Sequence, residues 1–177
     1  FGASPFVTLG GEIHRPNADG RFPALILLHG CSGIHRVHTE WAQWLRAQGY
    51  VAFVVDSFSG RDIRNLCYDS TPLRGEARSA DVFAAAQYLK TLPFVQSDRI
   101  GAMGWSHGGW AVLWASQHQN RYPLRLRALV AFYPECRDLI AYLGSTPLLM
   151  LLGGKDDWTP ASYCQFFARK ARNEGGP

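Results

Sequence analysis

The chain has 177 residues, of which 47% are hydrophobic and 18% charged, and its formal net charge is +4. This size and composition predict one compact domain over residues 1–177 that buries its own core. The scattered arginines predict no nucleic-acid partner, and the apolar runs are too short for a membrane-spanning helix, which needs about 20 residues.

Short strands and helices are predicted to alternate along the chain. An early strand is predicted over residues 6–13. Five later strands are predicted from apolar runs typical of buried strands, over residues 24–29, 50–56, 99–104, 128–133 and 147–152. Helical patterns between or after them cover residues 37–48, 75–92, a segment after Ser106, and 160–172. The alternation predicts an α/β fold, with a mostly parallel sheet and helices on both faces.

The four cysteines have neither the close spacing of a zinc site nor the density of a disulfide framework; they are Cys31, Cys67, Cys136 and Cys164. We expect four free thiols. The alternative is a Cys67–Cys136 bridge, which requires both residues to flank the same cleft and would indicate an oxidising compartment. A cytoplasmic location is expected slightly ahead of a periplasmic or secreted one.

The segment 99–109 carries the clearest chemical signal. It is predicted to form a strand, a tight turn and a helix start in immediate succession, with Ser106 in the turn between Gly104 and Gly108. A serine on such a strained turn exposes its hydroxyl at the carboxyl edge of the sheet, and small residues two positions before and after it avoid a collision. Gly-x-Ser-x-Gly also occurs by chance, but this context predicts that Ser106 is a nucleophile.

Two backbone N–H groups are candidates for an oxyanion hole. His107 begins the predicted helix, where the N–H is free and the helix dipole favours negative charge. Cys31 lies in the turn His29-Gly30-Cys31-Ser32-Gly33, directly after a predicted strand, where the second donor is expected. The alternative for that turn is an ordinary glycine turn. The Cys31 thiol is not expected to be the nucleophile, because no basic residue adjoins it.

Two aspartates compete to be the acid that orients a catalytic histidine. Asp156 and Asp157 both follow the predicted strand 147–152. We choose Asp156, which leaves the strand first, and interpret Asp157 as a surface or capping carboxylate near the helix that begins around Pro160.

Several ordered blocks resemble the dienelactone hydrolase family of α/β-hydrolases over nearly the whole chain. These blocks are Phe22-Pro23-Ala24, His29-Gly30, residues 55–58, 78–81 and 104–109, Tyr133-Pro134, and residues 154–160. The resemblance implies an α/β-hydrolase fold with Ser106 as nucleophile, Asp156 as acid, and Cys31 and His107 as backbone donors. The founding enzymes of the family use cysteine at the Ser106 position, so a general carboxylesterase is expected here.

The triad histidine is missing from its expected place. In α/β-hydrolases the order is serine, acid, histidine, yet all six histidines precede Asp156: His14, His29, His35, His38, His107 and His118. We expect the catalytic histidine after Pro177, together with a further strand and helix, so that the sequence is incomplete at its C-terminal end.

The upstream histidines have other expected places. The ring of His107 is expected to point away from the nucleophile, and His29 to support the oxyanion turn. His118 is expected on a helix surface, whereas His35 and His38 are expected to line the mouth of the pocket.

Other long side chains receive structural interpretations. Arg61 and Arg78 are expected to form surface or structural ion pairs, and the alternative is that they hold a substrate carboxylate, as arginines do in family members that act on anionic lactones. Four tryptophans are expected in the core or in a pocket wall; they are Trp105, Trp110, Trp114 and Trp158.

Together these features predict a serine hydrolase that cleaves a small-molecule ester or lactone through an acyl-enzyme. No metal or organic cofactor is expected, because neither a ligand cluster nor a dinucleotide or phosphate loop is recognisable. The oligomeric state stays open. One alternative is a peptidase or thioesterase on the same fold, and another is a binding protein that keeps the fold without a working triad.

Overall fold

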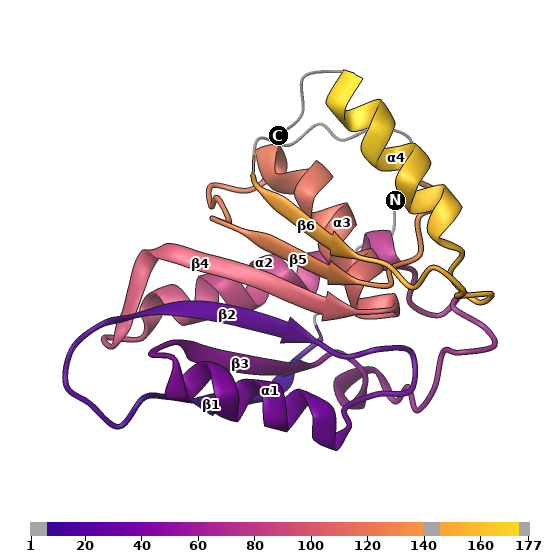
Figure 1. The fold of residues 1–177 in the computed structure, drawn as a ribbon. Coiled ribbons are helices and arrows are strands. Elements are labelled where there is room, and N and C mark those ends of the chain that lie inside the picture. The colour runs from indigo at the N-terminus through magenta and orange to yellow at the C-terminus, as the bar shows by residue number, and fades with distance from the viewer. Residues whose placement is uncertain (1–6, 140–145, 174–177) are drawn as a thin grey trace.

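The computed structural model describes residues 7–139 and 146–173. Its centre is a six-stranded sheet in the order β1-β3-β2-β4-β5-β6 (Figure 1). The strands are β1 (Gly10–His14), β2 (Phe22–Leu28), β3 (Val51–Asp56), β4 (Val95–Trp105), β5 (Leu129–Phe132) and β6 (Leu148–Leu151). Only the β1–β3 pair is antiparallel. The predicted mostly parallel sheet is confirmed, with strand bounds shifted by a few residues.

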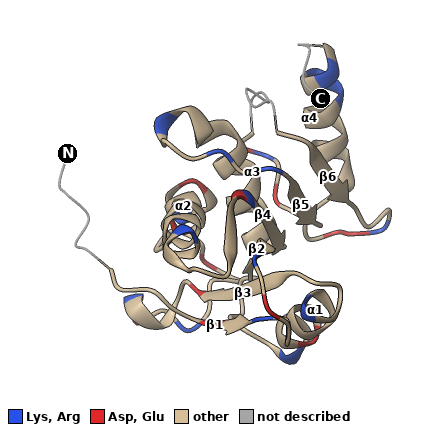
Figure 2. Ribbon diagram, turned by 90° about the vertical axis from the view of Figure 1, so that its left-hand side faces the viewer, with Lys and Arg blue, Asp and Glu red and all other residues tan. Residues whose placement is uncertain are grey.

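Helices cover both faces of this sheet (Figures 1 and 2). The described helices are α1 (Arg36–Ala47), α2 (Gly75–Thr91), α3 (His107–His118), α4 (Ala161–Asn173) and the short 3-10 helices Ser59–Arg61 and Gln119–Arg121. Side chains of β2 alternate between the faces: Ile26 joins the core formed with α2 and α3, and Leu27 joins the core formed with α1. Burial on both faces explains why β2 is almost wholly apolar.

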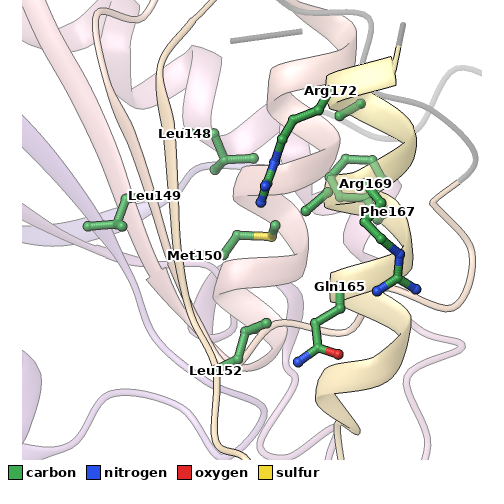
Figure 3. A pocket seen from close by; sticks show the side chains of 10 residues that line it. Leu148, Leu149, Met150, Leu152, Gln165, Phe167, Arg169 and Arg172 are labelled. Carbon is green, nitrogen blue, oxygen red and sulfur yellow. The ribbon is translucent and has the colours of Figure 1, made fainter.

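The outer strand β6 packs against α4 on one face. Cys164 and Phe167 of α4 share a core with Leu113 of α3, and a pocket of about 390 Å³ lies between β6 and α4. In Figure 3 Leu148 and Met150 point towards α4, whereas Leu149 points away, where it is 57% exposed. Neither the predicted nucleophile nor the predicted acid lines this pocket.

Both cysteine expectations are wrong. Cys31 is bonded to Cys67, and Cys136 to Cys164, so that none of the four is free. The paired residues are 36 and 28 positions apart, and only the fold brings them together. Disulfides persist mainly in oxidising compartments, so the structure does not support the expected cytoplasmic location.

Charged side chains are spread over the described part of the molecule. Figure 2 shows Lys and Arg on several helices and loops, interspersed with Asp and Glu. The longest described helix, α2, has 17 residues. Within the described ranges, no helix has the length and apolar character needed to cross a membrane.

Candidate active site

The predicted site residues gather at one edge of the sheet. Ser106 follows β4, Asp156 lies beyond β6, and Cys31 lies beyond β2. Because these strands are parallel, their carboxyl ends meet at the same edge, where the arrowheads of Figure 1 point. The fold thereby brings together residues that are more than 120 positions apart in sequence.

Two pockets meet at Ser106. The first, here called the Tyr68 pocket, has a volume of about 310 Å³ and is also lined by Arg74, Trp110 and Arg137. The second, here called the His35 pocket, has a volume of about 330 Å³ and also includes Asp156. Four residues line both pockets: Cys31, Ser106, Trp158 and Thr159. A substrate bound at Ser106 can therefore extend in two directions.

Ser106 occupies the strained turn that the sequence predicts. Its φ is 52° and its ψ is −115°, a left-handed conformation that a residue with a side chain rarely adopts. Glycine is required on both sides: a Cβ on Gly104 would overlap the Gly108 carbonyl, and a Cβ on Gly108 would lie 2.6 Å from the His29 carbonyl oxygen. The succession of strand, turn and helix is confirmed, and the nucleophilic role of Ser106 stays a prediction.

The turn after β2 approaches Ser106 closely. A Cβ placed on Gly30 would lie 3.8 Å from the Ser106 Cβ, an ordinary van der Waals contact, so the turn lies directly beside Ser106. The next residue, Cys31, is held from outside the turn by the bond to Cys67 and by its carbonyl, which accepts a hydrogen bond from the Leu66 N–H at 2.8 Å. The N–H groups of Cys31 and His107 stay predicted oxyanion donors.

The two aspartates have different surroundings. Asp156 lines the His35 pocket, where its Oδ1 accepts hydrogen bonds from the N–H groups of Trp158 at 3.0 Å and Thr159 at 2.9 Å. The Thr159 hydroxyl donates to its Oδ2 at 2.8 Å. These bonds, above all that of the Thr159 N–H, lower the pKa of the Asp156 carboxyl from its usual value. Asp157 is exposed and lines neither pocket.

A buried arginine connects the two sides of the site, and the sequence did not reveal this role. Arg78 on α2 is fully buried, and its Nη1 donates to the His29 carbonyl at 2.9 Å and to His107 Nδ1 at 3.0 Å. Burial lowers the pKa of Arg78 to about 9, which leaves it charged at neutral pH. Ion pairs were expected for both Arg61 and Arg78, and that of Arg61 is confirmed. Arg61 binds Asp81 through two hydrogen bonds of 3.0 and 2.7 Å.

Two histidines are fixed inside the site as neutral rings. Burial, followed by the charge of Arg78, lowers the pKa of His29 to about 3 and that of His107 to about 4. His29 Nδ1 lies 2.8 Å from the Gly30 carbonyl oxygen, so this ring supports the oxyanion turn as expected. The predicted surface position of His118 is wrong: it is buried, 3.2 Å from the Ser79 hydroxyl, because α3 packs against α2.

His35 and His38 line the second pocket, as expected. His35 Nε2 lies 2.7 Å from the Ser32 hydroxyl, and His38 Nδ1 accepts a hydrogen bond from the His35 N–H at 2.9 Å. Among the hydrogen bonds of residues 7–139 and 146–173, none joins a histidine to Ser106 or Asp156.

The tryptophans form walls and core, as predicted. Trp105 is buried and stacks on Phe132 with ring centroids 5.3 Å apart, and Trp114 packs against the core beneath α4. Trp110 lines the Tyr68 pocket, and its indole N–H donates to Asp138 at 2.7 Å. Trp158 lines both pockets but is 59% exposed.

The charges of the Tyr68 pocket are paired. Arg74 lies 3.3 Å from Asp138, and Arg137 lies 2.6 Å from Glu135. Within the part of the chain that the structure describes, no three His, Cys, Asp or Glu side chains are grouped so that they could hold a metal ion.

Comparisons with known proteins identify the family of the chain. The model of the dienelactone hydrolase family matches residues 9–176. A Bradyrhizobium protein, "Probable 2-oxo-3-(5-oxofuran-2-ylidene)propanoate lactonase", is 28% identical over 88% of this chain and 68% of its own length. A Neosartorya fischeri protein, "Probable dipeptidyl peptidase 4", is 33% identical over 51% of this chain. The match covers only 13% of that peptidase.

Solved structures share the fold. A dienelactone hydrolase-like promiscuous phosphotriesterase from metagenomic libraries superimposes with a TM-score of 0.77 at 20% identity, over 94% of this chain and 72% of that one. At this identity the likeness shows the fold alone. Together with the family match, it establishes the α/β-hydrolase fold.

Proposed function

The chain belongs to the dienelactone hydrolase family, and we propose that it hydrolyses carboxylic esters or lactones through an acyl-enzyme on Ser106. The observation that carries this proposal is the strained Ser106 turn, which is open to two pockets and shares one of them with Asp156, a residue beyond β6. Strain of this kind is retained where the surrounding structure over-determines it and function uses it.

In the first half of the reaction, the Ser106 oxygen attacks the carbonyl carbon while a histidine takes the serine proton. The N–H groups of Cys31 and His107 donate to the oxygen that becomes negative, and each such donor contributes about 10²–10³ in rate. When the tetrahedral intermediate collapses, the C–O bond to the alcohol breaks, and the alcohol leaves with the proton held by the histidine.

In the second half, water attacks the acyl-enzyme and gives its proton to the same histidine. The acid is released and Ser106 recovers its proton, so that one ester and one water yield one acid and one alcohol. Asp156 orients the histidine and offsets its positive charge. Its hydrogen bonds to Trp158 and Thr159 keep it ionised for this role.

The base in this proposal is a histidine from chain that follows Pro177. His29 and His107 do not suit the role, because burial holds their pKa values far below neutrality and a general base works best with a pKa near the operating pH. His38 is buried, and its Nδ1 already accepts the His35 N–H. A histidine from another segment would have to reach Asp156 at the rim of the His35 pocket.

A peptidase is the second candidate, because half of the chain resembles a dipeptidyl peptidase. A carboxylate that held the terminal amine of a peptide substrate would have to be free to pair with it. In the Tyr68 pocket Glu135 and Asp138 are already paired with Arg137 and Arg74. This pairing favours the ester hydrolase.

The two disulfides support an oxidising compartment as the place of action. Disulfides are rare in the reducing cytosol and persist in oxidising compartments. We propose a periplasmic or secreted location, which fractionation of the source cells would test.

Labelling with a fluorophosphonate probe tests the nucleophile in the full-length protein. Wild-type protein is expected to label once, at Ser106, and Ser106→Ala to lose the label. Ser32→Ala is a matched control, because Ser32 also lines a site pocket but has no proposed chemical role. A protein whose Ser106 stays unlabelled is the binding protein of the alternative hypothesis, and amides cleaved faster than matched esters would identify a peptidase.

A further inference from the structure

Two exposed aromatic rings stand beside Ser106. Tyr68 and Trp158 both line the Tyr68 pocket, and their ring centroids are 6.4 Å apart with planes tilted by 32°. Tyr68 is 95% exposed and Trp158 is 59% exposed. Large aromatic side chains usually bury most of their area, so a pair left open at a pocket that reaches a candidate nucleophile indicates a binding surface.

We propose that Tyr68 and Trp158 bind a flat, uncharged aromatic ring of the substrate, which makes esters with an aryl group near the ester bond the preferred substrates. This inference rests on the proposed ester hydrolysis and adds the class of substrate to it.

Tyr68 and Trp158 lie on loops that are bonded to residues of the predicted catalytic site. Tyr68 directly follows Cys67, whose disulfide holds Cys31 at the oxyanion turn. The Trp158 N–H donates to the carboxylate of Asp156. Tyr68 is therefore held close to Cys31, and Trp158 close to Asp156. A ligand bound by both rings would be positioned relative to Ser106.

The spacing of the rings suits a planar guest. Aromatic pairs interact at centroid distances of about 4.5–7 Å, so a pair at 6.4 Å with tilted planes is near the upper limit and leaves ring faces free. Carbon atoms in contact lie about 3.5–4.0 Å apart. A flat ring can approach these faces and stack on them, whereas a puckered alicyclic ring is thicker and has no π system.

The charges around the pair favour a neutral guest over an anionic one. Arg74 and Arg137 could hold a substrate carboxylate, but each is engaged with an acidic partner, Asp138 or Glu135. An anionic substrate would compete with one of these carboxylates for its arginine. A neutral aryl group meets no such competition, since it binds through the exposed ring faces.

Matched esters in the full-length protein test the proposal. Benzyl acetate is compared with cyclohexylmethyl acetate for the alcohol side, and ethyl phenylacetate with ethyl cyclohexylacetate for the acyl side. In each pair a methylene group insulates the ester from the ring, which keeps intrinsic reactivity similar. Ethyl acetate reports on ester hydrolysis alone.

The wild type is expected to prefer the aryl ester in at least one pair, by about 3- to 10-fold in kcat/KM for each stacked ring. Tyr68→Leu and Trp158→Leu should lower this preference at least about threefold, mainly through KM, and the aryl-to-alicyclic ratio within each variant is the readout, whatever its rate on ethyl acetate. Tyr68→Phe should keep the preference. Tyr88→Leu is the matched control, because Tyr88 is a half-exposed tyrosine on α2 that lines neither site pocket.

The ester panel distinguishes failure of the proposed hydrolysis from failure of the aryl preference. Failure to hydrolyse ethyl acetate and all four matched esters would overturn the proposed function, and this inference with it. Hydrolysis with equal aryl-to-alicyclic ratios in wild type and both leucine variants would overturn the inference alone. If a leucine variant does not fold, product inhibition of the wild type decides: benzyl alcohol should inhibit more strongly than cyclohexylmethanol, or phenylacetate more strongly than cyclohexylacetate, and equal inhibition within both pairs would overturn the proposal.

Discussion

Removal of the Cys31–Cys67 disulfide should impair both stability and turnover, and the other disulfide provides the comparison. The relation between loop length and chain entropy gives about 3.8 kcal/mol for a crosslink that spans 36 residues and about 3.6 kcal/mol for one that spans 28. The double variants Cys31→Ala/Cys67→Ala and Cys136→Ala/Cys164→Ala should therefore lose similar amounts of unfolding free energy.

Their activities should differ. Only the first disulfide holds the predicted oxyanion turn, whereas neither Cys136 nor Cys164 lines a site pocket. We expect kcat of Cys31→Ala/Cys67→Ala to fall by about 10-fold or more, yet by less than the 10²–10³ that follows loss of a donor. The hydrogen bond from the Leu66 N–H to the Cys31 carbonyl remains and should limit the displacement of the turn.

Denaturant unfolding with a constant m-value measures the loss of unfolding free energy. The turnover is measured as kcat on an ester, at temperatures where both variants are folded. A loss of less than about 1 kcal/mol in either variant would refute the entropic reasoning. Equal kcat values in the two variants would refute the role of the disulfide in positioning Cys31.

Three further predictions concern the aspartates, the glycine turn and pH. Asp156→Asn should lower kcat by about 10⁴-fold and Asp157→Asn by little; equal small effects would exclude both from the triad. Gly108→Ala should prevent folding or abolish activity, because its Cβ would meet the Leu28 and His29 carbonyls; normal activity would contradict the turn geometry. The unfolding free energy should fall by about 4 kcal/mol from pH 7 to pH 5, because unfolded histidines, with pKa about 6.5, bind protons in this range, whereas folded His29 and His107 stay neutral. Urea titrations at the two pH values measure this, and equal or greater stability at pH 5 would contradict the two pKa values.

The sequence determined the order of strands and helices and the Ser106 turn. These features are local: apolar runs set the strands, and the paired glycines around Ser106 are required by contacts within one turn of chain and its nearest strand. The sequence also placed Asp156 and Asp157 beyond the carboxyl end of a parallel strand, where an acid can lie, and the choice of Asp156 as the acid stays a prediction.

Only the tertiary structure determined which side chains pair with one another. The cysteines are paired over 36 and 28 residues, and Arg78 reaches from α2 to two loops at once, because packing brings together groups whose separation leaves no periodic signal in the sequence. The burial of His118 and the encounter of Tyr68 with Trp158 depend on the same packing. Local backbone structure could therefore be predicted from the sequence, whereas each pairing of distant side chains needed the three-dimensional fold.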